Sequence, residues 1–126
     1  MIDHVSLAVA DLARSTSFYE AVLAPLGLAK LVEREGASTG FGRRYPEFWL
    51  NARPGLSPRP QTTGTHICLR APSQEAVRAF HATALGLGAK DAGEPGPRQA
   101  AFTTYFGAFI LDPDGNKIEA VNFPRG

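Results

Sequence analysis

Two histidines and one glutamate are the residues of this sequence whose types and spacing could bind a metal ion. His4 begins the stretch His-Val-Ser-Leu, and His66 begins the similar stretch His-Ile-Cys-Leu 62 positions later. Glu119 lies in the alternating run over residues 117–123. Two imidazoles and one carboxylate suit a divalent metal and leave coordination positions open for water or substrate. The donor types do not discriminate among Zn, Ni, Co, Mn and Fe.

The alternation of the surrounding residues places these three side chains on the same kind of face. In a strand, successive side chains point to opposite faces. The apolar neighbours are expected to pack beneath helices: Val5, Leu7, Ile67, Leu69, Ile118 and Ala120. His4, His66 and Glu119 would then point into whatever the sheets enclose. A carboxylate there needs a partner, because an unpaired buried charge is costly, and a metal ion would supply one.

The repeated histidine belongs to a longer internal repeat, in which Phe18 matches Phe80 and Leu23 matches Leu85. Asp11 can cap a helix that runs to about residue 24, and Ser73 can cap the equivalent helix. The two helices should bury equivalent apolar stripes: Leu12, Phe18, Tyr19, Val22, Leu23 and Leu26 in the first, and Val77, Phe80, His81, Ala84 and Leu85 in the second. Each half therefore has a strand followed by a helix.

Shorter extended segments complete each half. Strands are expected near residues 28–34, 37–41 and 47–51, and then near 102–111 and 117–123, after a Gly/Pro-rich loop over 93–97. Residues 112–115 form a strong turn signal. Pro54, Pro58 and Pro60 mark a linker over 53–63. The sequence predicts an α+β fold of two β-α-β-β-β modules, 1–52 and 64–126, within a single domain over residues 1–126.

Several other side chains are expected to line the enclosed face. Trp49 would provide an aromatic wall, and Arg70, on the same face as His66, could hold an anionic group. Tyr105 and Phe109 alternate on one face, and Tyr105 is the best remaining proton donor or acceptor. The default interpretations of other residues are a buried thiol for Cys68, a packing role for His81, and surface charge for Arg43, Arg44 and Arg98. The three arginines lie in segments flanked by Gly and Pro and could instead close over a ligand.

Composition limits the class of protein. The 126 residues carry a formal net charge of +1, which provides neither a basic field for nucleic acid nor a polybasic membrane patch. No apolar run approaches the ~20 residues that span a bilayer. The single cysteine excludes an intrachain disulfide and favours a reducing compartment. We therefore expect a cytoplasmic protein that acts on a small molecule, without nucleic-acid or membrane partners.

Spaced motifs extend over almost the whole chain: His4-x-Ser-Leu-x-Val-x-Asp-Leu, Ser17-Phe18-Tyr19, His66, and the run from Asp112-Pro113-Asp114-Gly115 to Glu119. Together they resemble the vicinal oxygen chelate superfamily, which includes glyoxalase I, extradiol dioxygenases, fosfomycin-resistance thiol transferases and bleomycin-binding proteins. The resemblance implies paired modules that form a cup-shaped sheet around a divalent metal, usually in a homodimer. It also implies that His4, His66 and Glu119 are the metal ligands.

The sequence departs from the better-known members at two positions. Glyoxalase I has a fourth ligand, a glutamate, where strand facing places Trp49 here, and an indole cannot replace a carboxylate. A register shift would bring Glu47 to that place. Extradiol dioxygenases have a tyrosine ten residues before the glutamate, where this sequence has Phe109. These departures speak against glyoxalase I and ring-cleaving activity. They leave two functions open, a metal-dependent lyase, isomerase, transferase or dioxygenase-like enzyme and a non-catalytic protein that sequesters small molecules.

Overall fold

Two modules of the same design make up the chain. The computed structural model describes residues 1–60 and 63–124. The first module contains β1 (Val5–Val9), α1 (Leu12–Leu23), a short 3-10 helix (Ala24–Leu26), β2 (Ala29–Arg34), β3 (Ser38–Gly42) and β4 (Phe48–Ala52). The second contains β5 (His66–Arg70), α2 (Gln74–Gly86), β6 (Lys90–Gln99), β7 (Thr104–Leu111) and β8 (Lys117–Asn122). Between them, residues 53–60 run without helix or strand.

Each module forms its own four-stranded mixed sheet. The strand orders are β1-β4-β3-β2 and β5-β8-β7-β6, so the two sheets are topologically identical. The opening strand is parallel to the last strand of its module, and the other pairs are antiparallel. This arrangement confirms the predicted α+β fold of two βαβββ modules. It also places β1 and β5 at edges of their sheets, with β2 and β6 at the opposite edges.

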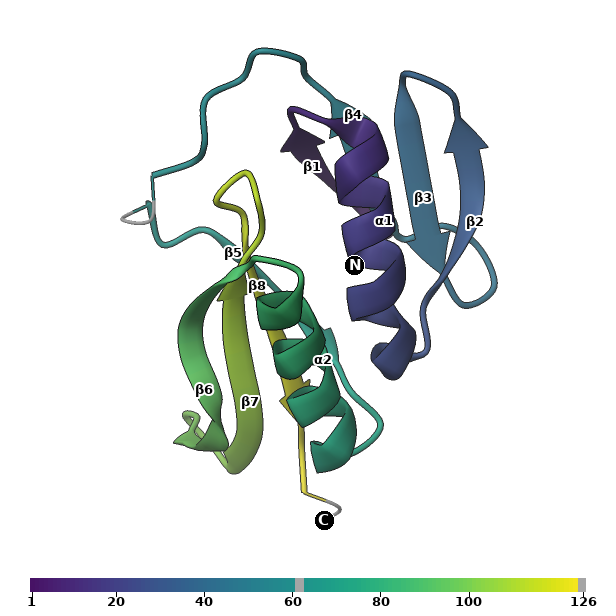
Figure 1. Ribbon diagram of the computed structural model, residues 1–126. Helices are drawn as coiled ribbons and strands as arrows, with labels where there is room; N and C mark the ends of the chain where they lie inside the picture. Colours follow the sequence, from purple (N-terminus) through teal and green to yellow (C-terminus); the bar gives the residue numbers. More distant parts are fainter. Residues whose placement is uncertain (61–62, 125–126) are drawn as a thin grey trace.

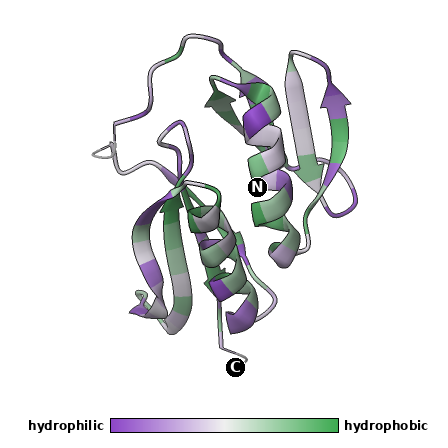
Figure 2. Ribbon diagram, viewed as in Figure 1, coloured by the Kyte–Doolittle hydropathy of each residue, from purple (hydrophilic) through white to green (hydrophobic). Residues whose placement is uncertain are grey.

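The two helices join the modules into one core. α1 packs on the first sheet, α2 packs on the second, and the helices contact each other (Figure 1). One apolar cluster includes Tyr19 and Val22 from α1 together with Val77 and Phe80 from α2, all fully buried. Figure 2 shows hydrophobic and hydrophilic residues alternating along both helices, as expected for helices with one buried face.

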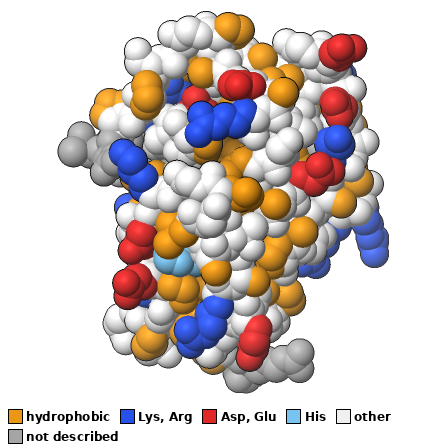
Figure 3. Space-filling model, in the orientation of Figure 1, with side chains coloured by type: hydrophobic (Ala, Val, Ile, Leu, Met, Phe, Trp, Pro, Cys, Tyr) orange, Lys and Arg blue, Asp and Glu red, His pale blue; other side chains and the backbone are white. Residues whose placement is uncertain are grey.

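The predicted helix starts are confirmed. The Asp11 carboxylate accepts a hydrogen bond from the backbone N–H of Arg14, and the Ser73 hydroxyl accepts one from Ala76. Gly27 follows the first helix with φ = 84°, a conformation that costs glycine little. Within residues 1–60 and 63–124, no helix is long and apolar enough to cross a membrane. On the face seen in Figure 3, acidic and basic side chains are interspersed.

Two local predictions were wrong. The expected loop at 93–97 belongs to β6, which runs from Lys90 to Gln99. Because β6 is an edge strand with irregular register, it tolerates Pro95 and Pro97, which lack a backbone N–H. Leu85, expected in the buried stripe of α2, is 37% exposed, because it lies one position before the helix end while Ala84 faces the core.

The turn between β7 and β8 connects the two modules through buried and partly buried hydrogen bonds. The Tyr19 hydroxyl of α1 donates to Asp112 Oδ2 at 2.6 Å, and the backbone N–H of Ala10 donates to Asp114 Oδ1 at 2.9 Å. The side-chain amide of Asn116 donates to the Ala8 carbonyl. Burial raises the pKa of Asp112 above its ordinary value. The sequence predicted a turn here, but not that it fixes the second module against the first.

Candidate functional site

Glu119 lies at the centre of the open face of the second sheet, the face opposite α2. On β8 it is the register partner of Cys68 on β5 and of Phe109 on β7. Glu119 is 4% exposed, and its Oε1 lies 3.3 Å from Nε2 of His66. Strand alternation therefore predicted the correct face for both residues. An imidazole nitrogen and a carboxylate oxygen at this separation suit the donor preferences of a divalent metal.

Tyr105 reaches the other oxygen of the same carboxylate. Its hydroxyl donates to Glu119 Oε2 at 3.2 Å. The ring lies over Gly107, because a Cβ built there would be 3.0 Å from the Tyr105 Cε2 atom. Desolvation, followed by the charge of Glu119, raises the pKa of Tyr105 above its ordinary value. The phenol is therefore protonated at neutral pH and available as a donor beside Glu119.

Aromatic and basic side chains surround this carboxylate. The Phe109 ring meets His66 edge-on, with ring centroids 5.6 Å apart, and Arg70 lies over Phe123 at 5.1 Å. Phe123 also contacts Tyr105, at a centroid distance of 5.7 Å. Phe123 was not among the predicted site residues. Strand alternation puts residues 119, 121 and 123 on one face, so the sequence could have predicted its position. Arg70, Tyr105 and Phe109 lie on the face where they were predicted.

His4 and Trp49 lie on the open face of the other sheet. They line a shallow pocket of about 380 Å³ together with Ser6 and Arg34. The indole lies across Gly40, where an added Cβ would be 3.1 Å from two ring carbons. Trp49 is in register with Ser6 and lies on the same open face of the sheet. Glu47 lies just before β4. His4 Nδ1 is 2.9 Å from the Asp3 carboxylate.

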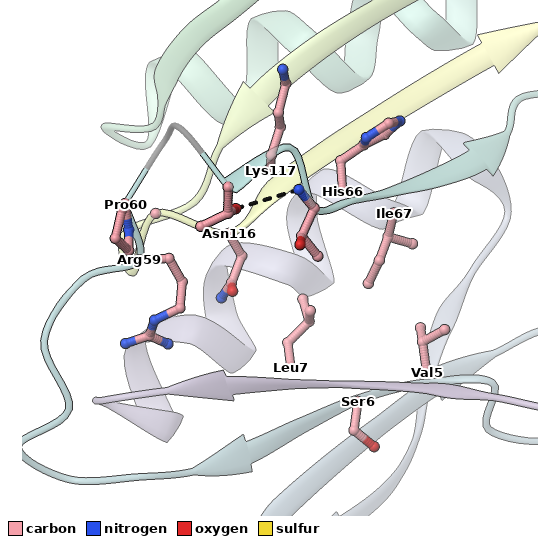
Figure 4. Close-up of a pocket in the computed structure, with 12 residues that line it drawn as sticks. Val5, Ser6, Leu7, Arg59, Pro60, His66, Ile67, Asn116 and Lys117 are labelled. Atoms are coloured by element: carbon pink, nitrogen blue, oxygen red, sulfur yellow. Dashed lines mark hydrogen bonds between the residues drawn. The ribbon is translucent and has the colours of Figure 1, made fainter.

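The open faces of the two sheets point in opposite directions where β1 and β5 approach each other. Figure 4 shows a pocket between these strands, of about 480 Å³, with Val5, Leu7 and Ile67 pointing toward it. In the same view His66 points away on one side and Ser6 on the other. The face that carries Ser6 and Trp49 therefore opens away from the face that carries Glu119.

One chain brings together only part of the predicted ligand set. His66 and Glu119 are neighbours, whereas His4 is paired with Asp3. His4 and His66 both line a further pocket of about 330 Å³, beside the start of β1. Across the described ranges 1–60 and 63–124, no group of three His, Cys, Asp or Glu side chains is arranged to hold a metal ion.

Comparison with known proteins now assigns the family. A family model described as the Glyoxalase/Bleomycin resistance protein/Dioxygenase superfamily matches residues 1–120. The chain belongs to this superfamily. No curated protein matches its sequence. The superfamily agrees with the resemblance seen in the motifs. Its description covers both enzymes and resistance proteins, so it does not fix the specific activity of this chain.

Solved structures of the glyoxalase/bleomycin resistance superfamily share the fold along nearly the full chain. A glyoxalase/bleomycin resistance protein from Albidiferax ferrireducens T118 is 32% identical, with a TM-score of 0.81, over 95% of this chain and 97% of that one. A glyoxalase/dioxygenase from Nostoc punctiforme is 22% identical, with a TM-score of 0.72, over 99% and 92%. The fosfomycin resistance protein FosX from Listeria monocytogenes is 18% identical, with a TM-score of 0.70, over 98% and 93%. The last two similarities concern the fold alone.

Cys68 of this glyoxalase-superfamily chain is exposed, not buried as its default interpretation held. Partial desolvation of the thiol, followed by the charge of Glu119, raises its pKa from 9.0 to about 12. At pH 8 we expect Cys68 in the metal-free protein to react with a disulfide reagent about 30- to 60-fold more slowly than an ordinary thiol, because the smaller fraction of reactive thiolate outweighs the higher nucleophilicity of that thiolate. The Glu119→Gln variant should react faster. A rate equal to that of free cysteine in both proteins would contradict the prediction.

Proposed function

We propose that this protein is a metal-dependent enzyme that acts on a small molecule chelated through oxygen atoms. Its ligands would be His66 and Glu119 of one protomer and His4 of a second copy. The observation that carries the proposal is the adjacency of His66 and Glu119, whose donor atoms are 3.3 Å apart on an open sheet face. Glu119 is almost fully buried, and a carboxylate in that position is stabilised by a cation.

A homodimer supplies the third ligand without any rearrangement inside the chain. Within one chain His4 is paired with Asp3 and lines the pocket that holds Ser6 and Trp49, so it does not join His66 and Glu119 there. β1 and β5 lie at sheet edges, and each carries one of the two histidines at or just before its start. A twofold dimer that places β1 of one protomer beside β5 of the other would face His4 toward His66 and form two equivalent sites.

When bound, a divalent metal acts as a Lewis acid that stabilises negative charge on substrate oxygen. The chain supplies the other parts of the site. Tyr105, a protonated phenol beside Glu119, is the candidate proton donor. Phe109 and Arg70 line the substrate side of the same sheet, and Trp49 of the second copy would provide the opposite wall. This combination serves reactions that pass through an enolate or alkoxide.

A non-catalytic sequestering protein is the second candidate function, and one observation favours it. Trp49 lies flat on Gly40 in the pocket that also holds His4, at the position where a fourth ligand would be expected. A flat indole on a sheet face suits binding of a planar ligand without turnover. Metal content separates the two functions, because only the enzyme needs the ion.

Elemental analysis tests the proposed enzyme directly. The wild-type protein, produced in metal-replete medium, is expected to retain a divalent metal, and the His66→Ala variant to lose most of it. Ligand removal should exceed the ~10–100-fold loss of affinity typical of outer-shell partners. His81→Gln is the matched control, because His81 is held by Asp91 on the far side of the sheet. Equal metal content in the wild type and His66→Ala would contradict the proposal.

A further inference from the structure

Phe109 lies between basic side chains from both neighbouring strands. β7 runs between β8 and β6, and each of these strands directs one cation at the ring. Lys117 Nζ from β8 lies 4.7 Å from the ring centroid, and the guanidinium carbon of Arg98 from β6 lies 5.7 Å from it. Figure 4 shows that Lys117 and His66 point to the same side of the sheet. The cations therefore border the candidate metal ligands.

None of these cations forms an ion pair within the described residues. Among residues 1–60 and 63–124, the ion pairs within 4.0 Å involve neither Arg98 nor Lys117, and Arg70 forms none. Glu119 is the one carboxylate at the centre of this face, and a bound divalent metal would offset its charge. Basic side chains that converge on one open face attract an anion.

The local geometry holds Arg98 in a fixed position on this face. Its guanidinium donates to the carbonyls of Glu94 and Gly96, at 2.7 and 3.1 Å. Gly93 provides the space for it, because an added Cβ would lie 3.0 Å from both Arg98 Nη2 and Phe109 Cδ1. A guanidinium oriented in advance loses less entropy when it binds an anion.

We infer that the substrate is an organic anion with a planar, aromatic body. Its aromatic body packs beside Phe109, and its carboxylate or phosphonate group lies between Arg98 and Lys117, the two cations over that ring. The inference rests on the proposed function, since it takes the open face of the second sheet as the substrate side of the site. It assigns specificity to Arg98, which the sequence analysis treated as surface charge.

The test is the affinity of the chelator-treated, full-length protein for small aromatic probes, measured by calorimetry or ligand-observed NMR. Benzoate and phenylphosphonate are the anionic probes, and benzamide is the neutral analogue. Without metal, affinity reports on the side chains alone, and the same titrations on Glu119→Gln remove the one carboxylate whose charge a metal would offset. We expect both anions, or the one whose geometry fits, to bind about tenfold or more tightly than benzamide. Arg98→Gln and Lys117→Gln should each remove most of that preference.

Arg78→Gln is the matched control. Arg78 makes the same kind of contact with Phe106, at 4.8 Å, but from α2 on the other side of the sheet, so the charge change and the lost cation–π contact are equivalent. Equal affinity for benzoate, phenylphosphonate and benzamide would overturn the inference, as would an equal loss in Arg78→Gln. Metal content is measured on separate samples. A protein that selects anions through Arg98 but never binds metal would support the inference and overturn the proposed enzyme.

Discussion

Two variants that bind no metal on their own are expected to bind it when they are combined in one dimer. His4→Ala removes the proposed ligand beside the first sheet, and Glu119→Gln removes a proposed ligand on the second. In a heterodimer of the two variants, one site lacks both ligands. The other site joins the intact His4 of one chain to the intact His66 and Glu119 of its partner. We expect about one metal ion per heterodimer, and close to none in either parental homodimer.

The experiment uses two different affinity tags, sequential purification of the co-expressed chains, and elemental analysis. Its control is a heterodimer of His66→Ala with Glu119→Gln. These two ligands lie on the same face of the same chain, so each site of that heterodimer lacks one of them. Restored metal in the control, or none in the His4→Ala and Glu119→Gln pair although the wild type holds metal, would refute a site shared between subunits.

Asp112→Ala is expected to lower the free energy of unfolding by about 3 kcal/mol or more. The carboxylate accepts four hydrogen bonds: from the backbone N–H groups of Asp114 and Asn116, from the Asn116 side chain, and from Tyr19. Asp112 is 4% exposed and Tyr19 is fully buried, so water does not readily replace the lost acceptor. Urea denaturation, with the midpoint and the slope both fitted, measures the change.

Asp11→Ala is the control for that measurement. It removes an exposed carboxylate that caps α1 through a single hydrogen bond to Arg14, so the expected loss is only about 1 kcal/mol. If the two variants lose the same free energy, the turn between β7 and β8 is not a main link between the modules.

The duplicated pattern of the sequence predicted the two βαβββ modules, and strand alternation predicted that His66 and Glu119 lie on one face of the second sheet. Alternation of apolar residues placed His66 and Glu119 on one side of β5 and β8, because the side-chain period of a strand leaves no other choice. The helix starts followed from Asp11 and Ser73, whose side chains satisfy free backbone N–H groups. Strand alternation and helix capping each depend on residues that are close together in the sequence, so both could be predicted.

The relative orientation of the modules could not be predicted in this way. Whether His4 faces His66 depends on how α1 packs against α2 and on where the turn after β7 docks, and both are contacts between residues far apart in the sequence. β6 was missed for a related reason. Its Gly and Pro content indicates a loop unless the strand is known to lie at a sheet edge.

The prolines of β6 have a consequence for how this protein behaves at high concentration. A sheet edge with a complete set of backbone donors can recruit strands from other molecules and start cross-β aggregates. Pro95 and Pro97 interrupt that set on the outer edge of the second sheet, and the irregular register bends it further. Uncontrolled polymerisation is thereby disfavoured along β6, whereas β1 and β5 contain no proline.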